Sequence, residues 1–343
     1  MQIGRREAIA GMGASVASLL PLQVGATSPG SSDLSFVHPD LRPAVEAMRE
    51  SFGGETHLTL ECLEAFRRSP LPETKPPLGV AKRSIAGAAG GAPVVIYIVN
   101  VRPGRKRGGI LYMHGGGYVL GSAGQDIATC QELAASLDCT VISVDYRLAP
   151  EARYCASLED NYAALRWVYQ NGRDLGIDPL RIALVGESAG GGHAALLAIA
   201  ARDRREVPVA FQCLVYPMLD DRTGSTRSVP APIGSLVWTA EVNRFGWHSF
   251  LGREPGHPEI TAGVAGREKT VSGLPPAWIG VGGIDLFVEE DMAFAARLIA
   301  AGIPAELTVV PGAYHAFQYF APATRVAKTF KASMLAALQA ALA

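Results

Sequence analysis

The stretch RIALVGESAGGGHAALLAIAA, at 181–201, decides the fold because it begins as a strand and ends as a helix. Aliphatic and β-branched residues fill its first half, and apolar residues recur at helical spacing in its second half. Ser188 lies at the sharp turn between them, flanked by Gly186 and Gly190. A plain turn would favour Asn, Asp or Gly at that position. We therefore expect the turn to hold the Ser188 hydroxyl out above one edge of a sheet, where it can react.

The rest of the chain alternates between two residue patterns, one typical of strands and one typical of helices. β-branched runs predict strands, and apolar residues at helical spacing predict helices. The predicted strands are 93–101, 109–113, 140–144, 181–185, 211–216, 277–281 and 306–310, and the predicted helices are 126–137, 158–169, 189–201, 291–300 and 325–342. This alternation indicates an α/β fold with a mostly parallel sheet and helices on both faces. A chain of 343 residues, 48% of them hydrophobic, can bury a large core.

Two segments interrupt the alternation. The first, 36–77, is helix-like and then rich in proline, and the second, 220–272, carries aromatic residues among many turn residues. A long insertion with aromatic residues indicates a lid or cap over a site. The candidates to line a pocket beneath it are Tyr216, Trp238, Phe245 and Trp247. The alternative is that these side chains only anchor the insertion to the body.

Residues 1–35 have a different composition from the rest. Arg5 and Arg6 precede a weakly apolar stretch that ends in small residues, which is the layout of a twin-arginine export signal. Glu7 and several glycines fit that layout less well, so a disordered extension is the alternative. The protein is accordingly expected in the periplasm or otherwise exported, or, without a working signal, in the cytoplasm. No run reaches the roughly 18 apolar residues that a membrane span needs.

Charge and cysteine usage exclude several classes of protein. The chain has 31 basic and 32 acidic residues and a net charge of −1, with no basic run, so we expect no nucleic-acid partner. Its five cysteines form neither a C-x-x-C pair nor a Cys/His cluster. We therefore expect no disulfide framework and no metal site at these cysteines.

A serine hydroxyl is a weak nucleophile and needs a base. His315 follows the last predicted strand, and Asp285 follows the predicted strand 277–281. Because parallel strands end at the same edge of a sheet, both side chains are expected close to Ser188. The chain order Ser188, Asp285, His315 is that of the α/β-hydrolases.

A fourth motif, His114-Gly115-Gly116-Gly117, follows the predicted strand 109–113. Three consecutive glycines cost conformational entropy, so a loop needs a reason to keep them. Without Cβ atoms the backbone can approach a ligand and aim its N–H groups at it. Together with the N–H of Ala189, at a helix N-terminus, these groups would form an oxyanion hole. A flexible glycine turn is the alternative.

With these motifs the chain resembles the bacterial esterases related to hormone-sensitive lipase, within the α/β-hydrolase superfamily. The resemblance runs from residue 36 to the C-terminus. Its motifs, in family order, are HGGG at 114–117, VDYRLAPE at 144–151, GESAGGG at 186–192, YPMLDDR at 216–222, GGIDLFVEED at 282–291 and PGAYHAF at 311–317.

The resemblance implies an α/β-hydrolase fold with an eight-stranded, mostly parallel sheet. It divides the chain into a catalytic domain at 81–217 and 273–343, an N-terminal part of a helical cap at 36–80, and a cap insertion at 218–272. It also implies hydrolysis of small-molecule esters of short to medium acyl chains by water, without metal or cofactor. An amidase or lactonase with the same residues, and a ligand receptor that no longer catalyses, are the alternatives. A homodimer is compatible with the sequence.

Residue by residue, the resemblance implies that Ser188 is the nucleophile, Asp285 the acid and His315 the base. The oxyanion donors implied are the N–H groups of Gly116, Gly117 and Ala189. Supporting roles are implied for His114, Gly115 and Asp145, which would hold the glycine loop in shape, and for Glu187, where many relatives have Asp.

Overall fold

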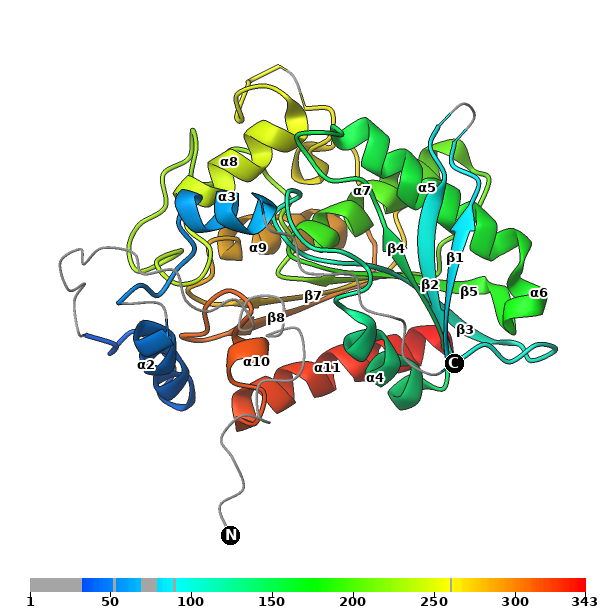
Figure 1. Cartoon of the computed structure of the whole chain (residues 1–343), viewed down its shortest axis with the longest axis horizontal. Coiled ribbons are helices and arrows are strands. Elements are labelled where there is room, and N and C mark those ends of the chain that lie inside the picture. The colour runs from blue at the N-terminus through cyan, green and yellow to red at the C-terminus, as the bar shows by residue number, and fades with distance from the viewer. Residues whose placement is uncertain (1–32, 52–53, 69–78, 89–90, 260) are drawn as a thin grey trace, which may run out of the picture.

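The computed structural model describes residues 33–51, 54–68, 79–88, 91–259 and 261–343 (Figure 1). The predicted export signal at 1–35 therefore lies almost wholly outside the described residues. Across the described ranges, no helix combines the length and the apolar character that crossing a membrane requires.

A single eight-stranded sheet forms the centre of the protein. Its spatial order is β1 (Val80–Ile85), β2 (Val94–Val99), β4 (Thr140–Asp145), β3 (Arg107–Met113), β5 (Ile177–Glu187), β6 (Phe211–Val215), β7 (Ala277–Gly282) and β8 (Ala305–Val310). β2 pairs antiparallel with β1 and β4, and the remaining neighbours pair in parallel. The predicted α/β-hydrolase sheet is thus confirmed. The strand pattern alone missed β1, because most of its side chains are exposed at the sheet edge and show no apolar alternation.

Helices cover both faces of the sheet (Figure 1). Two separate hydrophobic clusters lie between helices and sheet, one on each face. On one face lie α5 (Tyr154–Gln170), α7 (Ala189–Arg204) and α9 (Val288–Ala300), and on the other lie α4 (Ile127–Leu137) and α11 (Arg325–Leu342). The shorter elements are η1 (Pro39–Leu41), α6 (Gly172–Leu175), η2 (Ala265–Arg267) and α10 (Phe317–Phe320).

The two interrupting segments supply α2 (Arg42–Ser51), α3 (Leu60–Arg68) and α8 (Ala240–Leu251). α3 packs against α8, and the two helices lie together above the sheet in Figure 1. α2 lies apart from them, and its Val45 and Met48 join the hydrophobic cluster of the α4 and α11 face. The division into a cap at 36–80 and 218–272 stays a prediction.

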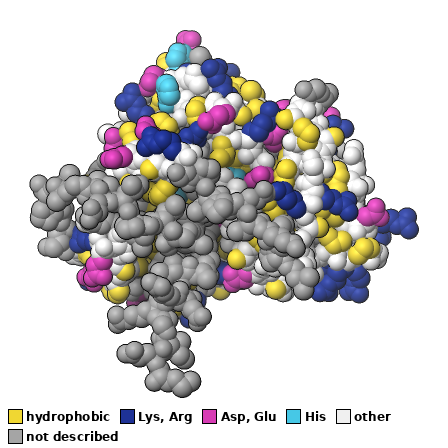
Figure 2. Space-filling view, in the orientation of Figure 1, with side chains coloured by type: hydrophobic (Ala, Val, Ile, Leu, Met, Phe, Trp, Pro, Cys, Tyr) yellow, Lys and Arg dark blue, Asp and Glu magenta, His cyan; other side chains and the backbone are white. Residues whose placement is uncertain are grey.

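The molecular surface carries charges of both signs. Basic and acidic side chains are spread over the face shown in Figure 2, where the described residues are visible. The sequence as a whole is nearly balanced, with 31 basic and 32 acidic residues.

His193, on α7, is buried inside the core with 1% of its surface exposed. The rings of Tyr118, Tyr146 and Phe250 surround it, with centroids 4.3 to 5.3 Å away. Burial, with a smaller contribution from nearby His114, lowers the pKa of His193 to about 3. The folded protein therefore keeps this imidazole neutral at a pH where the unfolded chain protonates it.

We expect His193 to make the protein less stable in mild acid. An unfolded histidine binds its proton near pH 6.5, so folding loses about 1.4 kcal/mol per pH unit as pH falls from there toward 3. In urea unfolding, the loss of stability between pH 7 and pH 5 should be about 2 kcal/mol smaller in His193→Gln than in the parent protein. An identical pH dependence in the two proteins would contradict the buried, neutral state.

Candidate active site

The turn between β5 and α7 places Ser188 in a strained conformation. Its backbone has φ 55° and ψ −122°, which side-chain-bearing residues rarely adopt. Three backbone hydrogen bonds hold it there: the Ser188 N–H donates to the Val215 carbonyl (2.9 Å), and the Ser188 carbonyl accepts from Gly192 (3.0 Å) and Met218 (2.9 Å). The serine is thus fixed between the ends of neighbouring strands, at their carboxyl edge.

The glycines on each side of Ser188 are required by close packing. A Cβ on Gly186 would lie 2.1 Å from the Gly190 carbonyl oxygen, and a Cβ on Gly190 would lie 2.1 Å from the Met113 carbonyl oxygen. Any side chain here would push helix and strands apart. The spacing G-x-S-x-G is therefore a packing requirement of this turn.

His315 and Asp285 meet Ser188 at the same edge. Asp285 follows β7, His315 follows β8, and they are 0% and 5% exposed. The Nδ1 atom of His315 lies 2.8 Å from Oδ2 of Asp285, and its Nε2 atom lies 3.0 Å from Oγ of Ser188. The other oxygen of Asp285, Oδ1, accepts the backbone N–H of Phe287 at 3.0 Å. The three residues predicted from the sequence thus form one continuous series of hydrogen bonds.

The direction of these hydrogen bonds follows from the acceptor chemistry. An ionised carboxylate can only accept, so the proton of neutral His315 resides on Nδ1 and its Nε2 is free to accept from the Ser188 hydroxyl. Aromatic rings pack around the imidazole: Tyr216 at 4.6 Å, Phe287 at 5.2 Å and Trp238 at 6.4 Å between centroids. The imidazole therefore has little freedom to leave the serine.

A cavity of about 350 Å³ opens onto Ser188 and His315. Tyr216 and Trp238, two of the four pocket candidates named from the sequence, are among its described lining residues. Among its described lining residues Phe245 and Trp247 do not occur. Trp247 instead packs in the interior against the rings of Tyr118 and Phe250, with centroids 5.1 and 5.9 Å away.

The glycine loop borders the same cavity. Gly116 and Gly117 have φ of 118° and 59°, and both line the cavity beside Ser188. The N–H groups of Gly116, Gly117 and Ala189 form no hydrogen bond with another described residue. Within the described part of the chain, these three N–H groups therefore have no protein acceptor.

His114 makes several contacts within and next to the glycine loop. Its Nδ1 atom lies 2.8 Å from the Gly115 carbonyl oxygen, its ring stacks on Tyr146 at 4.2 Å, and its own carbonyl accepts the Tyr146 hydroxyl at 2.6 Å. Asp145 accepts the N–H of Ala123, just beyond the loop, at 2.9 Å. The supporting roles of His114, Gly115 and Asp145 stay a prediction, and Tyr146, within the VDYRLAPE motif, is a further contact that the sequence analysis did not single out.

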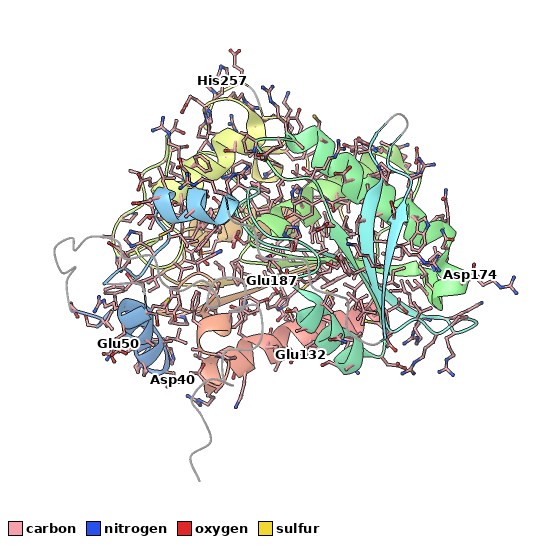
Figure 3. All side chains as sticks on the ribbon, viewed as in Figure 1. Asp40, Glu50, Glu132, Asp174, Glu187 and His257 are labelled. Carbon is pink, nitrogen blue, oxygen red and sulfur yellow. The ribbon has the colours of Figure 1, made fainter. Side chains whose placement is uncertain are left out.

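Glu187 is an acidic group on the cavity wall. It lies near the centre of the molecule in Figure 3, whereas the labelled Asp40, Glu50, Glu132 and Asp174 lie at the periphery. Glu187 accepts the hydroxyls of Tyr216, at 3.1 Å, and of Tyr319. Burial raises its pKa, although both hydroxyls oppose the shift.

Asp126 lines the same cavity, although the sequence pattern indicates it only as the start of the helix at 126–137. Its side chain is 3% exposed, and burial together with the nearby Glu187 charge raises its pKa well above the usual range. Nothing local distinguishes a helix-starting Asp from one that faces a cavity. Its place at the cavity depends on the packing of α4 against β2 and β4.

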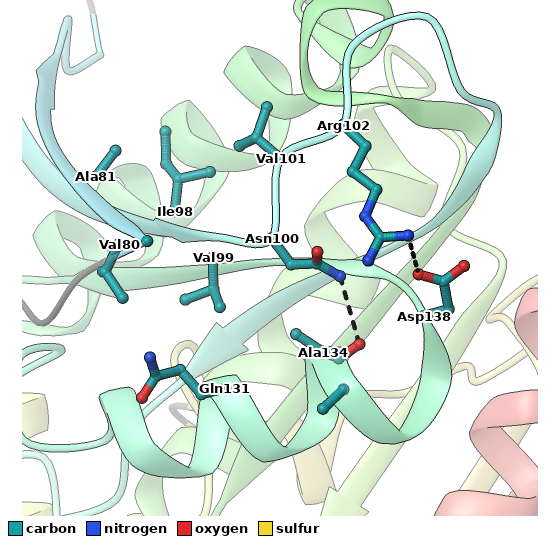
Figure 4. Close-up of a pocket in the computed structure, with 12 residues that line it drawn as sticks. Val80, Ala81, Ile98, Val99, Asn100, Val101, Arg102, Gln131, Ala134 and Asp138 are labelled. Carbon is teal, nitrogen blue, oxygen red and sulfur yellow. Dashed lines mark hydrogen bonds and ion pairs between the residues drawn. The ribbon is translucent and has the colours of Figure 1, made fainter.

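A second, larger cavity of about 730 Å³ lies between the β1–β2 edge of the sheet and α4 (Figure 4). Its lining includes the ion pair of Arg102 and Asp138, 3.1 Å apart, and Asn100, whose amide donates to backbone carbonyls. Its described lining holds no serine, cysteine or histidine. Of these two cavities, only the one beside Ser188 has both serine and histidine among its described lining residues.

A serine on a strand-to-helix turn, with its acid and histidine after later strands of the same sheet, defines the class of α/β-hydrolases. A family model described as alpha/beta hydrolase fold matches residues 110–319. Carboxylesterase NlhH of Mycobacterium tuberculosis is 34% identical over 89% of this chain and 97% of its own, and esterase LipI of the same species is 37% identical over 71% and 76%.

Solved structures of esterases are similar to this chain as well. A bacterial heroin esterase superposes with a TM-score of 0.78 at 30% identity, covering 90% of this chain and 99% of its own. Esterase LipW of Mycobacterium marinum superposes with a TM-score of 0.76 at 32% identity, covering 90% and 97%. The chain belongs to the α/β-hydrolase family of bacterial esterases related to hormone-sensitive lipase.

We expect Gly190→Ala to disturb the turn itself. The new methyl group would meet the Met113 carbonyl, so stability should fall by about 1–3 kcal/mol and the Ser188 oxygen should move. Thermal unfolding and ester hydrolysis measure the two effects. Ala195→Gly on the same helix is the control, since it costs about 1 kcal/mol of helix propensity but creates no clash. Full activity in Gly190→Ala would contradict the packing requirement.

Proposed function

We propose that the protein is a serine carboxylesterase that hydrolyses short- to medium-chain acyl esters through an acyl-enzyme intermediate. The observation that carries this proposal is the continuous series of hydrogen bonds from Asp285 through His315 to Ser188, ending at a cavity. Relatives named as esterases and carboxylesterases support the reaction class.

In the first half of the reaction, His315 Nε2 takes the proton of the Ser188 hydroxyl as Oγ attacks the ester carbonyl. Asp285 keeps the ring oriented and stabilises its protonated form. The negative charge that develops on the carbonyl oxygen is stabilised by the N–H groups of Gly116, Gly117 and Ala189. His315 then gives its proton to the leaving alcohol, and the acyl group stays on Ser188.

In the second half, water takes the place of the alcohol. His315 removes a proton from the water as it attacks the acyl carbonyl, and the same backbone donors stabilise the second tetrahedral intermediate. When that intermediate collapses, His315 returns the proton to Ser188 Oγ and the carboxylic acid leaves. In each half His315 takes one proton and gives one up, to the leaving alcohol in the first half and to Ser188 in the second, so the steps balance with the ester, water and these residues alone.

The cavity suits a compact acyl or alcohol group. Its apolar lining comes from both interrupting segments and from the body, namely Leu58, Phe66, Val119, Leu120, Leu148 and Val237. In this proposal α3 and α8 act as a cap, which excludes water and limits the length of the ester.

Replacing Ser188 by Ala should remove the reaction and leave the fold intact. We expect kcat to fall by on the order of 10⁶, because the nucleophile and its base act as a unit. Hydrolysis of p-nitrophenyl butyrate measures the rate, and circular dichroism checks the fold. A folded Ser188→Ala protein with a near-parental rate would exclude Ser188 as the nucleophile.

A panel of p-nitrophenyl esters should show a preference for short chains. We expect kcat/KM for butyrate to exceed that for palmitate by at least about tenfold, since methylenes that cannot enter the cavity lose their binding contribution. Equal values for the two esters, measured below the critical micelle concentration, would contradict a substrate site limited to this cavity.

A further inference from the structure

Trp238 is wedged between the glycine loop and His315. Its side chain is 3% exposed and lines the cavity. A Cβ on Gly117 would lie only 2.2 Å from the Cη2 atom of Trp238, so the indole lies directly against the Gly117 backbone. α8 approaches the same residue, because a Cβ on its Gly246 would lie 2.7 Å from the Gly117 carbonyl oxygen. The segment at 218–272 therefore packs against Gly117, whose N–H is one of the expected oxyanion donors.

Asn243, on α8, fixes the indole of Trp238. The Trp238 Nε1–H donates to the Asn243 side-chain oxygen at 3.1 Å, and the Asn243 amide donates to the Thr223 carbonyl at 2.8 Å. Asn243 is 0% exposed. With both ends of its amide engaged, only one orientation satisfies the two hydrogen bonds.

Thr223 is in turn tied to the helix that follows Asp285. Its hydroxyl donates to Glu290 in the first turn of α9, and Glu290 also accepts the backbone N–H of Leu219 at 2.6 Å and of Asp220 at 3.2 Å. Glu290 is 3% exposed. Hydrogen bonds thus run from α9 through Thr223 and Asn243 to the indole above the glycine loop.

The backbone before Trp238 is also held under strain. Val237 has φ 64°, an unfavourable conformation for a β-branched residue. Its N–H donates to the Thr56 carbonyl at 2.8 Å, and its carbonyl accepts the Leu58 N–H at 2.9 Å. Such strain persists only where the surrounding structure imposes it. Two chain segments therefore cooperate to place Trp238.

We propose that Trp238 and Asn243 are positioning residues for the oxyanion hole, Trp238 by contact with Gly117 and Asn243 by holding Trp238. This inference rests on the proposed esterase function and adds two residues to it. The indole keeps the Gly117 backbone from moving away from Ser188, so its N–H stays aimed at the developing oxyanion. Loss of this support weakens binding of the transition state more than binding of the substrate.

The test uses the full chain with three variants: Asn243→Leu, Trp238→Phe and the double variant. Each is assayed with p-nitrophenyl butyrate and with an alkyl trifluoromethyl ketone, which forms a tetrahedral adduct with an active serine. In Asn243→Leu we expect kcat to fall about tenfold, a fraction of the effect of losing a whole oxyanion donor. KM should change less than about threefold, and Ki of the ketone should rise about as much as kcat falls.

The double variant separates positioning from general packing. If Asn243 acts through Trp238, adding Asn243→Leu to Trp238→Phe should cause little further loss, whereas independent effects would multiply. Trp247→Phe is the matched control, because it alters another buried indole of the same segment that does not line the cavity. It should lower stability without raising Ki of the ketone.

An unchanged Ki in Asn243→Leu, multiplying losses in the double variant, or an equal rise in Ki for Trp247→Phe would each overturn the proposal. If Asn243→Leu does not fold, Trp238→Phe carries the test alone: a raised Ki with nearly constant KM supports the proposal, and an unchanged Ki overturns it. An inactive parent protein would instead refute the esterase function, so the two failures are distinguishable.

Discussion

The contact between the turn at Ser188 and the strands beneath it is the constraint on which the site depends. With φ at 55°, Ser188 projects its hydroxyl beyond the sheet, and glycines at 186 and 190 let helix α7 begin directly after β5. The same turn leaves the Ala189 N–H at the helix N-terminus, beside the glycine loop. One local conformation therefore places both the Ser188 hydroxyl and the Ala189 N–H, whereas Gly116 and Gly117 come from the loop after β3.

The remaining parts of the site are brought in by sheet topology. Because β7 and β8 run parallel to β5, the segments that follow them end at the same edge, and Asp285 and His315 meet there. The N-terminal segment is tied to this edge by Arg67 on α3, which donates to the carbonyls of Val119 and Ala149 and pairs with Glu151. α3, which contributes Arg67 to the cavity lining, is thus hydrogen-bonded to loops that also line the cavity.

Much of the fold and of the candidate site could be predicted from the sequence, for a physical reason. The G-x-S-x-G spacing, the glycine loop and the residues that follow buried strands are local patterns, and parallel topology converts them into neighbours in space. What could not be predicted depends on packing between distant segments. Trp238 and Trp247 are alike in the sequence, yet only Trp238 lines the cavity, because Asn243 and the strained Val237 turn it there.

The most direct test of the account is the site of reaction with a fluorophosphonate, read by mass spectrometry of the intact and digested protein. The account predicts one label per chain, on Ser188, and strongly slowed labelling in His315→Gln, since the serine needs its base to react. Labelling on another residue, or an unchanged rate in folded His315→Gln, would contradict it.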